Sequence, residues 1–196
     1  MSGRSGYTLI EILLVLAVLA VLAGIALPAL VQFSTEQAIR GASETVRSQL
    51  DLARMRAIET GKPYQFLYEP DGTHFLILPA ERDIAPSATF GASLATNPIH
   101  TATSGEITDG LIFHAGPGLV ARGHRLHLED LAELPNAGIL QQIQWSAPIT
   151  YQPDGTADEV TFRIADQNQR FIELSVRGLT GMAKASYLRQ ETTPWD

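Results

Sequence analysis

A single acidic residue, Glu11, lies at the start of an otherwise apolar segment. From Ile12 to Val31 the chain has 20 consecutive residues without a charge, most of them Leu, Val, Ala and Ile. At ~1.5 Å rise per residue, a helix of that length spans roughly 30 Å, the thickness of the hydrocarbon core of a bilayer. A carboxylate in such a helix costs about 2.5–3.5 kcal/mol at the centre and less near the end. The position of Glu11 therefore requires a physical explanation.

The composition excludes several functional classes. The chain of 196 residues has no cysteine, which excludes disulfides, thiolate metal sites and Cys nucleophiles. Its formal net charge of −7 disfavours a general nucleic-acid-binding surface. The hydrophobic content of 45% and the charged content of 18% are typical of a foldable chain. About 160 residues follow the apolar segment, enough for one domain with its own core.

The amino terminus has three interpretations, of which two rest on hydropathy. A secretory signal peptide would use Arg4, the apolar run and a small-residue cleavage site at 24–26, so that the mature chain would start near Leu27. An uncut membrane anchor fits the hydropathy equally well. Neither explains Glu11, and the uncharged run is longer than the ~7–15 residues of a usual signal-peptide core.

The third interpretation rests on the residues Gly-Tyr-Thr-Leu-Ile-Glu at 6–11. This stretch resembles the processing site of type IV pilins and type II secretion pseudopilins. The resemblance implies that a prepilin peptidase cleaves after Gly6 and methylates the new amino terminus at Tyr7. Glu11 then matches the family's assembly glutamate, and Pro28 matches its helix-loosening proline. Tyr7 departs from the family pattern, because the first mature residue is more often Phe or Met.

This resemblance offers an explanation for Glu11. Cleavage creates a cationic amino group at Tyr7. An isolated carboxylate and an isolated ammonium are each costly in lipid, whereas a pair of opposite charges offsets much of both costs. We therefore expect Glu11 of an entering subunit to pair with the Tyr7 amine of its neighbour in a filament. The simpler alternative is that Glu11 reaches the lipid headgroups from the end of the helix.

A second helical stretch follows the apolar run. Residues 34–60 place apolar side chains at steps of three or four, which predicts one buried stripe: Ile39, Ala42, Val46, Leu50, Ala53 and Ala57. Gly61, followed by Lys62-Pro63, predicts the end of this helix. The two stretches form either one long helix loosened at Pro28 or two helices joined near residues 32–33.

Alternating apolar residues and turn sequences predict an antiparallel β head. Segments 64–68 and 74–78 flank a Pro-Asp-Gly turn at 69–73, which predicts a hairpin. A second hairpin is predicted from segments 149–151 and 159–165, which flank a similar turn. Further strands are predicted at 111–113, 125–128, 139–145, 170–176 and 183–188.

Residues 79–138 are the least regular part of the head. The portion 79–105 is rich in Ala, Thr, Ser and Pro without a sustained period, so we expect a long surface excursion there. We hypothesise that this excursion contacts a neighbouring subunit. We also expect a head that stays folded when the excursion is deleted.

The search for catalytic chemistry is negative. The only cluster with metal-ligand spacing contains His124, His127, Glu129 and Asp130. The alternation of that segment resembles a strand, which would direct the two histidines to opposite sides, so no metal site is predicted. The two Pro-Asp-Gly-Thr turns each offer one carboxylate, too few for calcium. With no phosphate loop or nucleophile elbow, neither an enzyme nor a cofactor is expected.

The resemblance extends into the head. The stretch SQLDLARMRAIETGKPYQFLYEPDGTHF is similar to the helix-to-first-strand passage of the GspH/FimT group. Residues 149–186, with a Leu-Thr-Gly turn at 179–181, are similar to its closing strands. FimT-type minor pilins linked to DNA uptake have a basic motif after the turn glycine. Here Lys184 is the single cation in 181–186, so no nucleic-acid partner is expected.

The resemblance implies an α+β, type IV pilin-like fold with a long amino-terminal helix packed on an antiparallel β-sheet head. Residues 1–6 would be a cleaved leader and 7–31 a transmembrane and filament-core helix half. Residues 32–61 would be the amphipathic helix half, and 62–196 the β-rich periplasmic head that includes the excursion at 79–138.

The implied function is that of a minor pseudopilin of the type II secretion system. Such a subunit is a single-pass inner-membrane protein that joins a pseudopilus near its tip and helps export folded proteins across the outer membrane. Its partners would be the prepilin peptidase, other minor and major pseudopilins, the inner-membrane assembly platform and membrane lipid. One alternative is a FimT-like minor type IV pilin in pilus assembly or DNA uptake. The other is an exported β-domain binding protein with an ordinary signal peptide.

Overall fold

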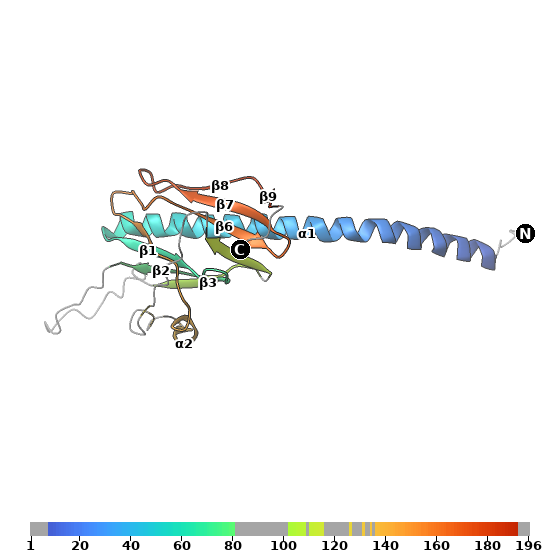
Figure 1. Cartoon of the computed structure of the whole chain (residues 1–196), viewed down its shortest axis with the longest axis horizontal. Helices are drawn as coiled ribbons and strands as arrows, with labels where there is room; N and C mark the ends of the chain where they lie inside the picture. Colours follow the sequence, from blue (N-terminus) through green and yellow to red (C-terminus); the bar gives the residue numbers. More distant parts are fainter. Residues whose placement is uncertain are drawn as a thin grey trace, which may run out of the picture. The chain divides into compact units, whose positions relative to one another are not determined.

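The structure is a computed structural model of the whole chain (Figure 1). It describes residues 8–80, 102–108, 110–115, 126, 131, 134 and 136–191, without the side chains of 24–34. Two compact units, Met1–Ala38 and Ile39–Asp196, are distinguished by their internal contacts, and each is described by itself.

One helix, α1, comprises Leu9–Thr60. Its backbone continues through residues 32–33, so the alternative of two separate helices is wrong. Gly61 follows the helix with a φ of 67°, the left-handed conformation that commonly ends helices and that glycine adopts without steric cost. The predicted end of the helix is thus confirmed.

The carboxyl-terminal half of α1 packs into the core of the second unit. All six residues of the predicted stripe are buried: Ile39, Ala42, Val46, Leu50, Ala53 and Ala57. Two arginines on other faces of the helix bind the strands and turns. The Arg54 Nε–H donates to the Gly155 carbonyl oxygen at 3.3 Å, and Arg56 Nη1 donates to Thr103 Oγ1 at 2.9 Å. The apolar stripe and these polar contacts together anchor this part of α1 to the head.

The head contains two antiparallel sheets, which lie alongside this half of α1 in Figure 1. Sheet A has the strand order β3-β2-β1-β5, formed by β1 (Tyr64–Tyr68), β2 (His74–Pro79), β3 (Thr103–Glu106) and β5 (Ile149–Tyr151). Sheet B has the order β4-β6-β7-β8, and β9 also pairs with β7; its strands are β4 (Leu111–Ala115), β6 (Val160–Asp166), β7 (Arg170–Val176), β8 (Ala183–Ala185) and β9 (Arg189–Gln190). The α+β class and the antiparallel head predicted from the sequence are confirmed.

Aromatic side chains join the two sheets. Phe66, Tyr68 and Phe75 come from sheet A, and Phe113 and Phe162 come from sheet B. The Tyr68 ring centroid lies 4.9 Å from that of Phe162 and 5.4 Å from that of Phe113, within the range of favourable aromatic pairing. All five side chains are buried, so this cluster is the part of the core that both sheets share.

The first predicted hairpin is confirmed, and its turn also connects the sheets. Strands β1 and β2 pair in register from Tyr64↔Pro79 to Tyr68↔Phe75. The Asp71 N–H donates to the Phe113 carbonyl oxygen at 2.7 Å, and the Phe113 N–H donates to the Gly72 carbonyl oxygen at 2.9 Å. Asp71 has a φ of 59°, as this tight turn requires.

The second predicted hairpin is wrong in its pairing. The turn forms, because the Asp154 carboxylate accepts the Thr156 N–H at 2.9 Å and the Thr156 hydroxyl at 2.7 Å. These hydrogen bonds lower the pKa of the Asp154 carboxyl, and they support a turn role rather than calcium binding. Next to the turn, Tyr151 and Ala157 form an antiparallel bridge, and the Asp158 N–H donates to the Thr150 carbonyl oxygen at 3.0 Å. The strands themselves do not pair, because β5 pairs with β1 of sheet A, whereas β6 joins sheet B.

Three further predictions can be compared with the structure. The strand expected at 139–145 is wrong, because Ala137–Leu140 is a short helix, α2, and the buried Trp145 ring donates to the Leu140 carbonyl oxygen at 3.1 Å. Residues 103–106, expected within the surface excursion, form β3 instead. Of the strand expected at 125–128, only Leu126 is described, and it belongs to no strand.

The excursion contributes to the core of the head, contrary to the expectation that it could be deleted. It supplies β3 to sheet A and β4 to sheet B. Its leucines at 126, 131 and 134 are also buried in one cluster with Leu76 and Trp145. Removal of 79–138 would take away two strands and part of this cluster, so we no longer expect such a deletion to leave the head folded.

The buried hydroxyl of Tyr151 leads to a stability prediction. Within the part of the chain that the structure describes, this hydroxyl has no hydrogen-bond partner, although the residue is fully buried. Burial, followed by a smaller contribution from Asp51, raises the pKa of Tyr151 well above its ordinary value. Because an unsatisfied buried hydroxyl costs about 1–3 kcal/mol, Tyr151→Phe should leave the free energy of unfolding unchanged or raise it by up to about 1 kcal/mol. Chemical denaturation of the full chain in detergent measures this difference.

Tyr64→Phe is the matched control for that substitution. Tyr64 is equally buried, but its hydroxyl has a side-chain hydrogen bond with Thr60. We expect this control to lower the free energy of unfolding by about 1 kcal/mol. Equal losses for the two variants would mean that the Tyr151 hydroxyl has a partner.

Candidate assembly segment at the amino terminus

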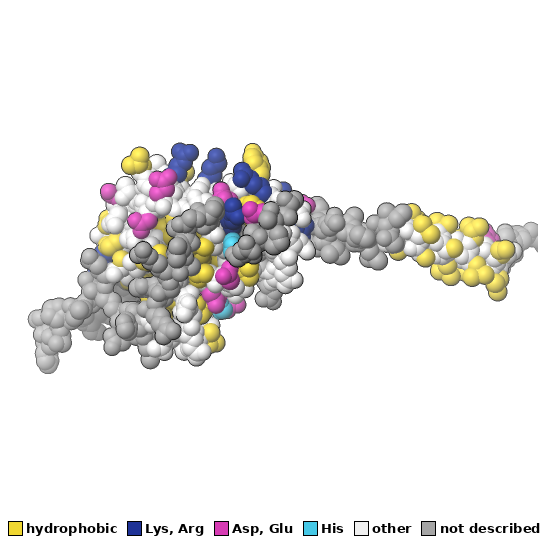
Figure 2. All heavy atoms as spheres, viewed as in Figure 1, with side chains coloured by type: hydrophobic (Ala, Val, Ile, Leu, Met, Phe, Trp, Pro, Cys, Tyr) yellow, Lys and Arg dark blue, Asp and Glu magenta, His cyan; other side chains and the backbone are white. Residues whose placement is uncertain are grey.

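The described part of the first unit is an apolar helix without a buried face. Its large side chains are 47–79% exposed in the single chain, on every side of the helix: Leu9, Ile10, Ile12, Leu13, Leu14, Val15, Leu16, Val18, Leu19, Val21 and Leu22. Figure 2 shows hydrophobic side chains over the surface of this segment. A helix that is apolar all round is normally buried, either among other helices or in lipid. This segment therefore requires apolar neighbours that the single chain does not supply.

Within the described residues, no helix is long and apolar enough to cross a membrane. The uncharged run 12–31 includes 24–31, whose side chains lie outside the described part. The transmembrane role of 7–31 stays a prediction.

Thr8 caps the amino end of α1. Its Oγ1 accepts the Glu11 N–H at 3.3 Å, and its carbonyl oxygen accepts the N–H groups of Glu11 and Ile12 at 3.1 and 3.3 Å. Thr-x-x-Glu is the sequence signature of a capping box, in which Glu and Gln are both favourable at the third helical position. Our sequence analysis did not use this signal. It assigns Glu11 a local role in starting the helix in addition to any role in assembly.

Glu11 has no cationic partner within the described residues. Its side chain is exposed in the first turn of α1, where the helix dipole favours a negative charge. Gly6 and Tyr7, the predicted cleavage and methylation residues, lie outside the described residues. The structure thus brings Glu11 to the start of an exposed apolar helix, and its pairing with Tyr7 stays a prediction.

Pro28 lies within α1, and the helical backbone passes through it. Its side chain is outside the described part, so the predicted loosening of the helix at this point is not tested. The helix does not end at Pro28, because α1 continues to Thr60.

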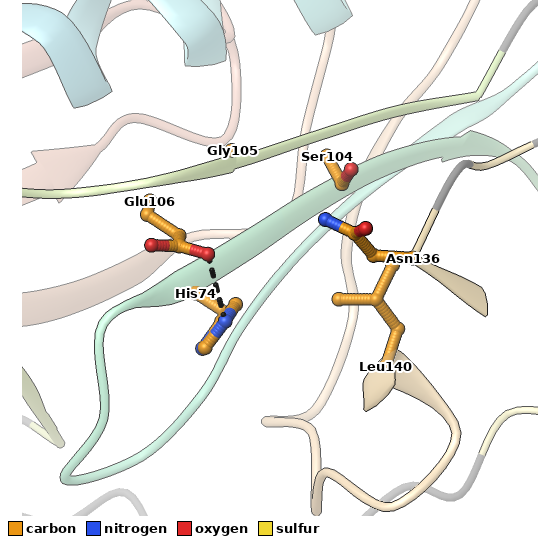
Figure 3. A pocket seen from close by; sticks show the side chains of 6 residues that line it. All are labelled: His74, Ser104, Gly105, Glu106, Asn136 and Leu140. Carbon is orange, nitrogen blue, oxygen red and sulfur yellow. Dashed lines mark ion pairs between the residues drawn. The ribbon is translucent and has the colours of Figure 1, made fainter. Parts of the chain in front are cut away.

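A polar pocket of about 190 Å³ lies between β3 and α2, and sequence reasoning did not anticipate it (Figure 3). His74 Nε2 lies 3.1 Å from Glu106 Oε1, and His74 Nδ1 lies 2.7 Å from Glu69 Oε2. Both ring nitrogens can donate to carboxylates at once only when the imidazole is protonated. Asn136 and Leu140 of the α2 region complete the wall.

The pocket does not amount to a metal centre. Within the described residues, no group of three His, Asp or Glu side chains is arranged to hold a metal ion. Of the cluster considered in the sequence, His124, His127, Glu129 and Asp130 all lie outside the described residues.

Comparison with known proteins finds a known motif at the amino terminus. Residues 1–27 match the family model described as the prokaryotic N-terminal methylation motif. The matched range contains Gly6, Tyr7 and Glu11, and Pro28 follows it directly. No curated protein matches the chain.

Three solved structures have a similar fold. Two are of the minor pseudopilin EpsH from the type 2 secretion system of Vibrio cholerae. One is 11% identical, with a TM-score of 0.46, over 76% of this chain and 95% of that chain. The other is 12% identical, with a TM-score of 0.48, over 80% and 99%. The type IV minor pilin FimU of Pseudomonas aeruginosa is 15% identical, with a TM-score of 0.44, over 79% and 92%.

The capped helix, its exposed apolar surface and the matched motif agree on the nature of this segment. A match to the N-terminal methylation motif covers residues 1–27, and the described part of the helix in this range requires apolar neighbours. The chain therefore carries a prokaryotic N-terminal methylation motif, joined through one long helix to an antiparallel β head.

Proposed function

We propose that this chain is a minor pseudopilin of the type II secretion system, of the GspH-like kind. The observation that carries the proposal is the methylation motif over residues 1–27, in which Gly6, Tyr7 and Glu11 have the spacing of a prepilin. Prepilin peptidase cleaves after Gly6 and methylates Tyr7. The mature subunit then enters a periplasmic pseudopilus near its tip and contributes to the export of folded proteins across the outer membrane.

The physical basis of the proposal is the exposed helix. Side chains at 9–22 that are exposed in the single chain are covered first by inner-membrane lipid and then by the helices of other minor and major pseudopilins. The inner-membrane assembly platform brings these subunits together, and the head remains in the periplasm. Pro28 loosens the helix within this bundle by removing one backbone hydrogen bond. No enzymatic activity and no nucleic-acid partner are part of the role.

Intact-mass spectrometry of the protein from its own host tests the processing step. We expect a chain that starts at Tyr7 with one added methyl group. A start near Leu27 would instead mean that the amino terminus is a signal peptide of an exported binding protein. Retention of residues 1–6 would contradict the proposal, because the amine that pairs with Glu11 would not exist.

Disruption of the gene distinguishes secretion from pilus assembly. For a pseudopilin, folded exoproteins should accumulate in the periplasm, and surface pili should be unchanged. Loss of pili or of DNA uptake with normal secretion would favour the minor type IV pilin instead. The low count of cations after Gly181, with Lys184 alone in 181–186, supports the secretion role over DNA uptake.

A further inference from the structure

The outer edge of sheet B carries an unusual combination of side chains. Residues 177–190 form the β7–β8 turn, β8 and β9, and they contain no carboxylate. The exposed cationic and large apolar side chains of this edge, which we call the edge surface, are Arg177, Leu179, Met182, Lys184, Tyr187 and Arg189. In Figure 2, dark-blue and yellow side chains gather on the side of the head where Figure 1 places β8 and β9.

The large apolar members of the edge surface are all more than half exposed. Leu179 is 91% exposed, Tyr187 is 88% exposed and Met182 is 59% exposed. Tyr, Met and Arg are residue types that are enriched at protein–protein interfaces relative to the rest of a surface. Several large apolar side chains together on one edge are typical of a surface that is covered by a partner.

A hydrogen-bonded turn holds Leu179 in its exposed position. The Gly181 N–H donates to the Arg177 carbonyl oxygen at 2.8 Å, and the Arg177 N–H donates to the Met182 carbonyl oxygen at 3.1 Å. Gly181 has a φ of 60°, and a Cβ there would lie 2.5 Å from the Gly155 carbonyl oxygen. The turn at 177–182 is therefore packed closely against the turn that contains Gly155. A partner that contacts Leu179 would lose little conformational entropy in ordering this turn.

A β-bulge directs Tyr187 outward. Leu174 pairs with Ala185, and Ser186 donates its N–H to the Glu173 carbonyl oxygen at 2.8 Å, whereas Phe171 pairs with Arg189. The pairing register between β7 and the edge thus shifts by one residue at Ile172. Two edge residues, 187 and 188, lie opposite this single residue of β7. Bulges of this kind re-aim side chains and prevent uncontrolled pairing of edge strands.

The three cations of the edge surface have no acidic partner among the described residues. Two carboxylates near this edge, Glu173 of β7 and Glu191 just after β9, form ion pairs with Arg163 instead, at 3.5 and 3.0 Å. Glu159 lies beside Gly178, but it forms no ion pair with Arg177. The edge is therefore positive on a chain whose formal net charge is −7.

We propose that the edge surface binds a neighbouring protein subunit through a segment in which carboxylates alternate with apolar side chains. The carboxylates would pair with the unpaired cations, and the apolar side chains would cover Leu179, Met182 and Tyr187. A nucleic acid fits less well, because the phosphate backbone offers nothing apolar and three cations give only weak phosphate binding. The inference rests on the proposed function for one point, that the neighbour is a filament subunit.

Photo-crosslinking in the native host tests this surface in the full chain. A photoreactive phenylalanine analogue replaces Tyr187, and the same analogue at Ile139 is the control, because Ile139 is also exposed (61%) but lies on α2. We expect a discrete protein adduct from position 187 alone. The partner peptide, identified by mass spectrometry, should contain Asp or Glu next to apolar residues.

Two matched pairs of variants test the chemistry of the contact. Lys184→Glu should lower the adduct yield at least about fivefold, whereas Arg40→Glu, with the same charge change on α1, should leave it unchanged. Leu179→Ser should likewise lower the yield, and Ile139→Ser should not. All four positions are exposed, so each variant should keep its stability within about 0.5 kcal/mol, which thermal unfolding of the same preparations checks.

Several outcomes would overturn the inference. They are an adduct to lipid, to nucleic acid or to a second copy of this chain, no adduct from position 187, and a yield that Lys184→Glu does not change. The amino terminus is read by mass spectrometry in the same samples. A chain processed at Tyr7 without the adduct would reject the edge surface while the filament role stands. A retained leader would reject the filament role independently of the adduct.

Discussion

Glu11→Gln is expected to give a chain that is inserted and processed normally but enters filaments at least about tenfold less than the native chain. Glutamine keeps the capping box with Thr8, so the helix should still start at the same place. What is lost is the negative charge that would neutralise the Tyr7 amine of the neighbouring subunit. Breaking a buried ion pair on one side costs about 3–5 kcal/mol, which is more than a tenfold change in an association constant.

The measurement compares membrane-bound and filament-bound chain after shearing, with the mature mass read from both fractions. Glu59→Gln is the matched control, because it removes the same charge from an exposed position near the other end of α1. It should be incorporated normally. Glu11→Val removes the charge and also the polar side chain of the capping-box signature, while the backbone N–H that donates to Thr8 Oγ1 remains. A defect larger than that of Glu11→Gln would report the contribution of this polar side chain. Normal incorporation of Glu11→Gln would refute the pairing role.

Phe162→Ala is expected to lower the free energy of unfolding of the head by about 3–5 kcal/mol, the range measured for large aromatic residues in protein cores. Phe162 is fully buried, and its ring lies 4.9 Å from Tyr68 and 6.2 Å from Phe113. It is thus one of the rings through which the two sheets contact each other. Its removal leaves a cavity at the place where the sheets meet, and no nearby side chain can fill it without moving a strand.

Chemical denaturation of the full chain in detergent, followed by tryptophan fluorescence, measures this loss, because Trp145 is buried in the head. Tyr187→Ala is the matched control: it removes an aromatic side chain of sheet B's outer edge that is 88% exposed. That variant should change the free energy of unfolding by no more than about 0.5 kcal/mol. A loss below about 1 kcal/mol for Phe162→Ala would mean that the sheets are not held together at this ring.

Local signals in the sequence were sufficient for the elements that depend on neighbouring residues. The stripe from Ile39 to Ala57 repeats with the period of a helix, and every member is buried. Gly61 ends the helix because the left-handed conformation costs glycine nothing. The hairpin of β1 and β2 forms around its Pro-Asp-Gly turn, and β7 has the predicted bounds.

Other elements could not be predicted, because their pairing depends on segments that are distant in the sequence. The β5 strand has the composition of a hairpin partner for β6, yet the strand with which it pairs is β1. The β3 strand, Thr-Ser-Gly-Glu, has no apolar period, and only β2 beside it makes it a strand. The apolar residues at 139–145 are compatible with a short helix as well as with a strand. The hydrogen bond from the buried Trp145 ring to the Leu140 carbonyl oxygen favours the helix.

The same division applies to the candidate sites. The methylation motif and the exposed apolar helix were predictable from the sequence, because the motif is a short stretch and apolarity is a property of each residue. The capping role of Thr8 was also present in the sequence as Thr-x-x-Glu. The pocket of His74 and the edge surface were not predictable, since each is formed by residues whose proximity depends on strand pairing.

The sequence by itself determined that this chain begins with a processing motif, continues as a long helix and ends in a β head, because periods and turn residues act over a few positions. Only the tertiary structure decided which strands share a sheet and that the excursion supplies two of them. It also decided that one edge combines exposed apolar side chains with cations that have no acidic partner among the described residues. The physical reason is that strand pairing is selected by the fit of distant surfaces in the folded core, which no short stretch of sequence contains.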